Sequence, residues 1–457
     1  MRRFLCSAVL FCAAVCFGDF PEMFESRSRS SVIVDFMFVR PDGNIKLQAV
    51  ASVWDKSGLA LIAPGDIPDD ARLDCLKNFK AFYRGGPADG IDAEFLGSDP
   101  VSGMNFVRIK GGAPKEVVPL SAFGRARTEI AAKLWSFITG IEDNSFIVHY
   151  AQGHVSAVRE SSVVRIFVSD AIARHGSGVF DSDGKFVGLA VSSSSEPVVL
   201  ELENGSELTA AMRSFKADVL ISADDVEKIA ARVPETALAD NRGWLGVGNL
   251  SVVSRSAATL MGLKDAAVAV SEVFKNSPAH AAGLKAGDII VSLDGKPLRR
   301  MLTDADTLET FTDTLALLGA DTAAEFGVLE NGAVKGVKVK LGRFPADVRR
   351  SRVKYFEKLG FSVRELVLED AFAHRILDAS ARGATVEFVK PNGSAETDNA
   401  AYLEEGDRIL EVNSQPVKTF DDAVALLEKA RASKNKTVSV LAEGFNETKL
   451  VKIKIEK

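Results

Sequence analysis

Cysteine is almost missing from this chain of 457 residues. Of its four cysteines, three stand within the first 16 residues, and the remaining one is Cys75. A chain that keeps only Cys75 forms no internal disulfide, which is compatible with an oxidising compartment because a large core does not need covalent staples. We expect Cys75 to be a small buried apolar residue rather than a reactive thiol.

Excess charge of one sign and long apolar runs are also scarce. Lysine and arginine number 56 against 62 acidic residues, a net charge of -6 without a polybasic face. This balance argues against nucleic acid as a partner. After residue 18, no apolar stretch is long enough to span a membrane. The length suits about three domains of ~150 residues each.

The first 18 residues have the pattern of an export signal. Two arginines precede an apolar run over 4–17, and Gly18 then precedes Asp19. The run is near the ~7–15 residues of a signal core and shorter than the ~20 residues of a spanning helix. We expect export to the periplasm or beyond, with a retained signal anchor as the alternative.

A repeat marks the C-terminal half of the chain. Residues 281–290 read AAGLKAGDII and residues 400–409 read AAYLEEGDRI, roughly 120 positions apart. Each copy continues into a strand with a tight turn, and amphipathic helices are predicted after the two copies at 307–318 and 421–430. The offset is too long for a solenoid and suits two copies of a small domain.

The stretch before residue 240 is rich in short β-type runs separated by Gly, Asp and Pro turns. This pattern is typical of an antiparallel sandwich or barrel. The predicted strands cover 31–39, 47–53, 105–109, 145–150, 163–168 and 186–191. A helix predicted at 223–233 closes the region, and a linker at 234–241 follows because Pro234 ends the helix.

The two repeats resemble PDZ domains. Ahead of the first copy stands RGWLGV (242–247), and ahead of the second stands KLGFSV (358–363). Both segments resemble the carboxylate-binding loop of PDZ domains, in which glycine lets consecutive N–H groups converge on an anion. The strand after this loop is expected to have an unpaired edge, to which a peptide end adds as another strand.

The resemblance implies a set of peptide-binding residues in each copy. For the first copy these are Leu245, Gly246 and Val247 at the ligand carboxylate, with Leu308, Phe311 and Leu315 in the side-chain pocket. For the second copy they are Leu359, Gly360 and Phe361, with Val424 and Leu427 on the helix. The apolar pockets favour ligands that end in an apolar side chain. Alternatively, the glycines only make turns and the apolar residues only fill the core.

The region before residue 240 resembles the trypsin-like double β-barrel of the HtrA (Deg) serine proteases, which commonly precedes one or two PDZ domains. The segments that carry the likeness are GHVSA (153–157), FVSDA (167–171) and GSGVFDSDGKFVG (176–188). The predicted organisation is therefore mainly β, with a signal peptide at 1–18, a double barrel at 19–240, and PDZ domains at 241–345 and 346–457.

The catalytic triad of this family is absent where the resemblance places it. The chemistry needs a serine, a histidine base and an orienting aspartate. The nucleophile position falls on His175, the base on Gly65 and the acid on about Gly103, while Ala173 replaces a glycine that helps to shape the oxyanion hole. No histidine occurs in residues 19–110, and a serine without a base is a weak nucleophile. We therefore predict no catalytic site and no cofactor.

Other residues offer weaker chemistry. Ser177, between two glycines, is the alternative nucleophile. We interpret His149 and His154 as strand or loop residues rather than relocated bases. His175 lacks the companion ligands of a metal site, so no metal is predicted.

The sequence predicts an exported HtrA-like pseudoprotease that binds C-termini or extended segments of other proteins. It would act as a chaperone-like adaptor or scaffold in protein quality control of the envelope. One alternative is an active serine endopeptidase at Ser177, and another is a scaffold that docks one dedicated partner. HtrA relatives generally form trimers through the barrel and an aromatic N-terminal segment. Phe20, Met23 and Phe24 are candidates for that contact, or form an ordinary tail.

Overall fold

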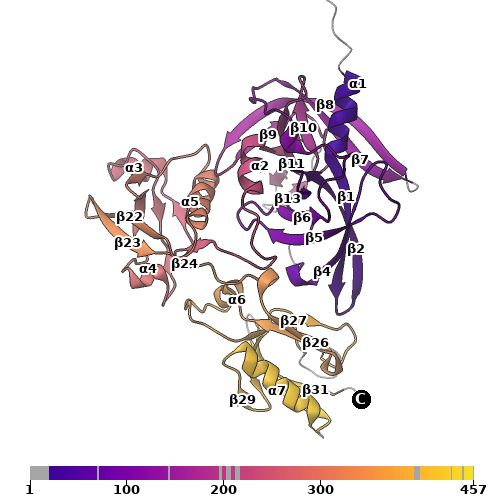
Figure 1. Ribbon diagram of the computed structural model, residues 1–457. Coiled ribbons are helices and arrows are strands. Elements are labelled where there is room, and N and C mark those ends of the chain that lie inside the picture. The colour runs from indigo at the N-terminus through magenta and orange to yellow at the C-terminus, as the bar shows by residue number, and fades with distance from the viewer. Residues whose placement is uncertain are drawn as a thin grey trace, which may run out of the picture.

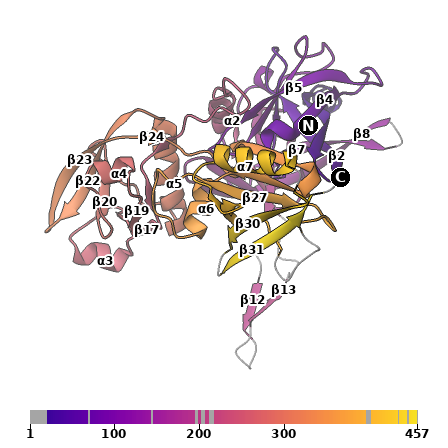
Figure 2. The same cartoon turned by 90° about the horizontal axis from the view of Figure 1, so that it is seen from below.

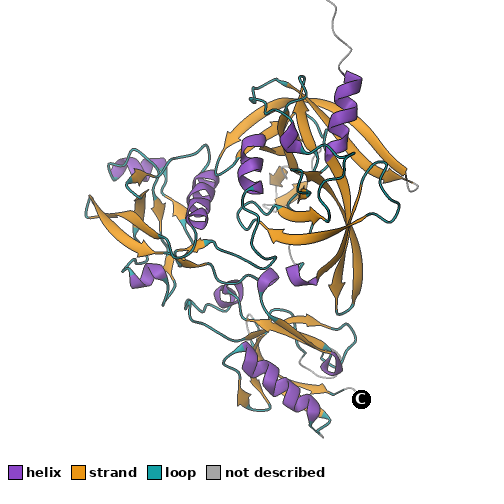
Figure 3. Ribbon diagram, in the orientation of Figure 1, coloured by secondary structure: helices purple, strands orange, loops and turns teal. Residues whose placement is uncertain are grey.

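The computed structural model describes residues 20–68, 71–142, 145–194, 198–201, 207–210, 217–395, 402–433, 435–444 and 447–455. The predicted signal peptide at 1–18 lies outside these residues. Strands dominate the regular structure (Figure 3), as predicted. Two barrels at the N-terminal end are followed by two smaller modules, one beside the barrels and one below them in Figure 1.

The first barrel closes in the strand order β1-β2-β3-β6-β5-β4. Its strands are β1 (Ser31–Arg40), β2 (Gly43–Val53), β3 (Leu59–Ile62), β4 (Leu76–Phe82), β5 (Ile91–Ser98) and β6 (Asn105–Ile109). Phe36 and Phe79 stack inside it, with ring centroids 4.9 Å apart. Cys75 is half-buried against this core rather than fully buried as predicted, and burial raises the pKa of its thiol.

The second barrel closes in the order β10-β11-β14-β9-β8-β7. Its strands are β7 (Lys133–Glu142), β8 (Ser145–Glu160), β9 (Val164–Val168), β10 (Gly178–Asp181), β11 (Phe186–Ser194) and β14 (Ala217–Ser222). A separate hairpin pairs β12 (Val198–Glu201) with β13 (Glu207–Ala210). The helix α2 (Ala223–Ala230) is shorter than the predicted 223–233, because Ala231 and Arg232 already form the turn that closes it.

A short N-terminal helix, α1 (Phe20–Arg27), packs on the barrels of its own chain. Met23 is buried in the core between the barrels, and the ring of Phe24 meets Phe137 edge-on at 5.5 Å. The guanidinium of Arg27 donates to the carbonyl of Gly184 at 3.0 Å. Met23 and Phe24 therefore have partners within the chain, and the trimer contact stays a prediction.

The first module comprises the elements from β15 to β24. They are β15 (Gly243–Trp244), β16 (Val247–Gly248), β17 (Ser251–Val252), α3 (Arg255–Leu260), β18 (Val268–Ala269), β19 (Glu272–Val273), α4 (Pro278–Ala281), β20 (Ile289–Leu293), β21 (Lys296–Pro297), α5 (Asp304–Leu318), β22 (Ala323–Glu330), β23 (Ala333–Lys340) and β24 (Gly342–Arg343). The helix α5 begins earlier than predicted because Thr303 and Asp306 form a capping box.

The second module comprises the elements from β25 to β31. They are β25 (Val353–Phe356), β26 (Phe361–Glu365), α6 (Leu368–Ala373), β27 (Ala384–Val389), β28 (Arg408–Val412), β29 (Gln415–Pro416), α7 (Phe420–Ala432), β30 (Thr437–Glu443) and β31 (Thr448–Lys454). The helix α7 lies across one face of the sheet (Figure 2) and covers the predicted 421–430.

The modules are anchored to the barrels in different ways. On the first module, Glu309 pairs with Arg165 of the second barrel at 2.5 Å. On the second module, Ser351 and the carbonyl of Val348 accept hydrogen bonds from Arg72, a nearly buried side chain after the first barrel's β3. The first module is held by this partly exposed pair and by Arg159, which donates to the buried Asp306 carboxylate at 2.8 Å, whereas the second module is held by buried hydrogen bonds of Arg72.

Candidate functional site

The two barrels meet where the resemblance places the triad. His175 lies on the loop before β10, and its Nδ1 is 3.5 Å from Oδ1 of Asp66, the residue after Gly65. Gly103 also faces this place, since a Cβ built on it would lie 3.3 Å from Pro64. The structure therefore brings the three predicted positions together, with an Asp–His pair among them.

The Asp66–His175 pair combines a carboxylate with an imidazole at the place where the resemblance puts the triad. Among the described residues, the His175 ring pairs with Asp66, and the Asp218 carboxylate also interacts with it electrostatically. Burial raises the pKa of Asp66, and the positive charges of His175 and Arg174 oppose that rise.

Ser177 points into the protein rather than into the cleft. Its side chain is fully buried, and its Oγ has no hydrogen-bond partner within the described chain. The preceding Gly176 packs so tightly that a Cβ there would lie 2.1 Å from the carbonyl oxygen of Val50. Ser52 Oγ donates to the carbonyl of Gly176 at 2.7 Å. This turn joins the two barrels and presents no free hydroxyl.

The loop that precedes His175 is held by a buried carboxylate. Asp218 on β14 accepts hydrogen bonds from the N–H groups of Ile172 at 2.6 Å and Ala173 at 2.7 Å. Its burial raises the pKa of the Asp218 carboxyl. Ala173 is the residue that the resemblance assigns to the oxyanion hole. Its amide is thus occupied by the chain's own oxygen and is not available to a developing oxyanion.

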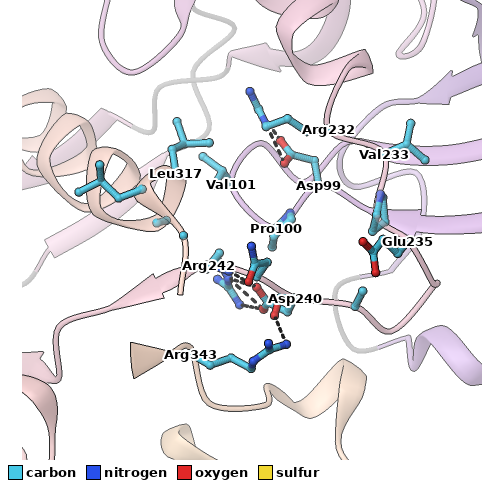
Figure 4. Close-up of a pocket in the computed structure, with 16 residues that line it drawn as sticks. Asp99, Pro100, Val101, Arg232, Val233, Glu235, Asp240, Arg242, Leu317 and Arg343 are labelled. Carbon is cyan, nitrogen blue, oxygen red and sulfur yellow. Dashed lines mark hydrogen bonds and ion pairs between the residues drawn. The ribbon is translucent and has the colours of Figure 1, made fainter. Parts of the chain in front are cut away.

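The Asp99 carboxylate, four residues before Gly103, also has another partner. It is buried and accepts two hydrogen bonds from Arg232, at 2.7 and 3.2 Å (Figure 4). The pair borders a cavity of about 570 Å³ formed with the linker at 234–241 and the end of α5. Asp99 therefore ties the barrels to α2 rather than orienting an imidazole.

The first module has a strand with a free outer edge. β16 pairs only with β19, and β17 is the terminal strand in the order β17-β18-β20-β22-β23. Phe274 N–H donates to the carbonyl of Gly246 at 3.0 Å, so Val247 falls at a ladder position whose N–H and C=O point away from β19. This edge has the geometry that accepts an added peptide strand.

The turn before β16 has the predicted shape. Gly246 has φ +82°, and a Cβ there would lie 2.2 Å from the Cβ of Ser277, so glycine is required. Ser277 Oγ donates to the Gly246 carbonyl at 3.1 Å. In the described part of the chain, the N–H groups of Leu245 and Gly246 have no recorded acceptor. The turn thus presents amides to the head of the groove.

The pocket residues of the first module divide into two groups. Phe311 and Leu315 on α5 are buried and pack with Leu245 in the module core. Leu308 is half-buried at the edge of this core. Phe311 and Leu315 therefore form the floor beside the groove, and Leu308 is the predicted residue best exposed to a ligand.

The predicted peptide-binding residues of the second module lie in and around its core. Leu359 and Phe361 are fully buried, and Leu427 on α7 is buried in the same core, with Val424 packed at its edge. The Gly360 N–H already donates to the carbonyl of Phe356 at 2.9 Å. The open carboxylate-binding turn expected at Leu359, Gly360 and Phe361 therefore stays a prediction, and in the conformation described the Gly360 amide is bonded within the chain.

Strand β25 is one of the elements that the sequence did not predict. It pairs antiparallel with β26, placing Val353 opposite Arg364 and Phe356 opposite Phe361. Its four residues, VKYF, are too short a run to be recognised as a strand on their own. The outer edge of β26 is consequently paired within the chain.

Metal and membrane features can be examined over the same residues. The described ranges contain no group of three or more His, Cys, Asp or Glu side chains placed to hold a metal ion.

Across the described residues, no helix combines the length and apolar character needed to cross a bilayer.

Comparisons with known proteins agree with this architecture. Family models of the PDZ domain match residues 270–310 and 351–443. A "probable periplasmic serine endoprotease DegP-like" of Pseudomonas fulva (strain 12-X) is 30% identical over 213 residues, 45% of this chain and 41% of that protein. A protein of the same description from Ectopseudomonas mendocina (strain ymp) is 24% identical over 372 residues, 78% of this chain and 70% of that protein.

The chain spans between 36% and 53% of the length of four such relatives. Among solved structures, the HtrA-type protease AlgW with a decapeptide has a TM-score of 0.51 at 15% identity, covering 72% of this chain and 99% of that one. AlgW with a tripeptide gives 0.50 at 17% identity, with 71% and 98% covered. These structures share the fold. With two PDZ domains behind a trypsin-like double barrel and DegP-like relatives, this chain is similar to the HtrA (Deg) proteases.

Proposed function

We propose that this HtrA-like protein is a pseudoprotease that captures polypeptide C-termini or extended segments in the first module. The observation that carries this proposal is the unpaired outer edge of β16 and β17 behind the Gly246 turn. A chain end that adds to this edge forms backbone hydrogen bonds along the strand, and its carboxylate meets the free amides of Leu245 and Gly246.

The barrels serve as a scaffold in this proposal. The Ala173 amide is bound to Asp218, Ser177 is buried, and His175 pairs with the Asp66 carboxylate. Loss of a triad serine or histidine lowers turnover by ~10⁶ in a protease built on the same logic. The arrangement therefore supports binding without hydrolysis.

The periplasm is the proposed location, in agreement with the names of the relatives and with the export signal expected at residues 1–18. Clients would be unfolded or misassembled envelope proteins with exposed ends. The solved AlgW structures contain a decapeptide or a tripeptide, which supports peptides as ligands here. A trimer remains part of the proposal because family members with this barrel generally assemble in that way.

The proposal is tested by separating binding from cleavage. Purified protein is expected to bind a fluorescent peptide with an apolar C-terminal residue and to leave casein intact over a long incubation. A fluorophosphonate probe should leave Ser177 unlabelled. Casein cleavage that disappears in the Ser177→Ala variant would establish the active endopeptidase instead.

Amidation of the peptide's C-terminus provides the control for the binding arm. The amide keeps the side chains but removes the negative charge, so binding should weaken if the Gly246 turn holds a carboxylate. Equal binding of both forms would contradict recognition of chain ends.

A further inference from the structure

Strand β25 lies where a ligand would lie in the second module. A peptide end bound to a PDZ groove runs antiparallel to the groove strand, between that strand and the helix. β25 runs antiparallel to β26 along the edge opposite β27. The chain thus supplies its own strand at the ligand position.

The side chains of β25 follow the pattern of a bound peptide. Successive strand residues point to opposite faces, so Lys354 and Phe356 share one face. Phe356 is 2% exposed and packs in the core that contains Leu427 of α7. Nζ of Lys354 lies 3.7 Å from Oε1 of Glu428, also on α7. An aromatic end residue in an apolar pocket and a base two positions earlier both face the helix.

Arg352 fixes the upstream end of the same strand. Its guanidinium lies 2.9 Å from Asp421 at the start of α7 and 3.2 Å from Glu365, and it stacks on the ring of Phe420 at 4.8 Å. Its carbonyl accepts the Glu365 N–H at 2.9 Å, which extends the ladder by one residue. Arg352 therefore continues the every-second-residue contact with α7.

The downstream end of β25 also matches the end of a bound peptide. The Phe356 carbonyl accepts the N–H of Gly360, the amide expected to receive a ligand carboxylate. Phe356 thus stands at the place of a C-terminal residue, although the chain continues through the 3₁₀ turn Glu357–Leu359. The peptide bond of Phe356 replaces the carboxylate.

We propose that β25 is a built-in ligand that keeps the second groove closed. We also propose that the groove prefers peptides whose ends have the same sequence pattern as β25. The selected ligand is a chain terminus with an aromatic last residue and basic residues two and four positions before it. Because β25 is tethered, its effective concentration is in the ~mM range, so an external terminus enters only when β25 is loosened. This inference rests on the proposed function in one respect, the peptide site of the first module.

The test is a calorimetric titration of the full chain with the peptide Ser-Arg-Val-Lys-Tyr-Phe bearing a free carboxylate, a copy of residues 351–356. The wild type is expected to bind one peptide per chain, in the first module. The double variant Arg352→Ala/Lys354→Ala loses the pairs with Asp421, Glu365 and Glu428 and is expected to bind two. The matched control Lys264→Ala/Lys436→Ala removes two exposed lysines that have no recorded partner and should still bind one.

The stoichiometry separates this inference from the proposed function. No binding by the wild type and one peptide on the double variant contradicts the first-module site but supports the closed second groove. Two peptides on the wild type, or the same number of peptides on the wild type and on the double variant, overturns the inference. A peptide with glutamate at both basic positions should bind the second site at least tenfold more weakly, because it faces Asp421 and Glu428.

A reversible disulfide between β25 and β26 tests whether the second site of the double variant comes from release of β25 or from a folding defect. Tyr355 and Ser362 face each other in β25 and β26, at a non-hydrogen-bonded pair where Cβ atoms approach to about 4.5–5.5 Å. We add Tyr355→Cys/Ser362→Cys to the double variant, with Cys75→Ser to remove the one other cysteine after residue 16. Oxidation should abolish the second site and reduction should restore it. A second site that persists in the oxidised form overturns the inference.

Discussion

The first and second modules share a repeat, a fold and a glycine turn, but the strand before that turn pairs with a different partner in each module. In the first module, β15 leaves the groove and pairs with β24, so Gly243 lies opposite Arg343. In the second module, β25 folds back on β26 and closes the groove. The direction of a few residues ahead of the turn therefore decides whether a PDZ groove is available.

One residue explains much of this difference. Gly243 approaches the end of α5 so closely that a Cβ there would lie 2.5 Å from the carbonyl oxygen of Leu315. Gly243 stands two residues before Leu245, and Glu357 stands two residues before Leu359. A side chain larger than glycine does not fit the route taken by β15, and the second segment, which carries a glutamate there, forms a hairpin instead. The comparison teaches that matching loops do not guarantee matching grooves.

The largest expected effect comes from emptying the second groove. Phe356→Ala removes a buried aromatic ring, and such losses cost about 3–5 kcal/mol of unfolding free energy. Chemical denaturation should show this loss, and titration should show a second peptide site. Phe326→Ala, also fully buried but in the first module, is the control and should lower stability without adding a site. A second site in neither variant would mean that β25 is an ordinary core strand.

The next effect concerns the open groove. Leu308→Glu places a charge at the half-buried edge of the first pocket and is expected to cost about 2 kcal/mol of binding, roughly a 30-fold weaker affinity. Fluorescence anisotropy with an apolar-ended peptide measures the change. Thr314→Glu, on the exposed face of the same helix, should leave affinity unchanged. Equal loss in both variants would point to damage of the helix rather than of a pocket.

A third test compares how the modules are anchored. Arg72→Ala removes hydrogen bonds from a nearly buried guanidinium to Ser351 and Val348, worth about 1.5–3 kcal/mol. Arg165→Ala removes a half-exposed pair with Glu309, worth about 0.2–1 kcal/mol. Hydrogen exchange at the facing segments should rise more in the first variant. The reverse order would show that the first module is the more firmly held.

The smallest effect is expected where the two modules touch. Hydrogen bonds from Ser380 and Asn276 lower the pKa of Asp378 to about 2, and they favour its ionised form. The hydrogen bonds to ionised Asp378 therefore stabilise the contact between the modules above the usual carboxyl pKa near 3.8. This stabilisation is lost as pH falls through about 2. Cross-linking between the modules should decline over that interval. Asp378→Asn should remove this pH dependence, and an unchanged profile would assign it to another group.

The sequence alone predicted the barrel strands at 105–109 and 163–168 closely, because alternating apolar residues and turn residues act locally. It also predicted the two copies of the small domain, and the resemblance placed the triad positions at 65, 103 and 175, a prediction that stays open. These conclusions depend on residue identity and spacing, which are visible without coordinates.

Only the tertiary structure decided which polar groups are already in use. The Ala173 amide is taken by Asp218, 45 residues later in the chain. The edge of β26 is taken by β25, whose short sequence gives no sign of its pairing. Backbone N–H and C=O groups are the same in every residue except proline, so their availability follows from which segments the fold brings beside them. The closed second groove and the occupied amide were therefore beyond the reach of the sequence.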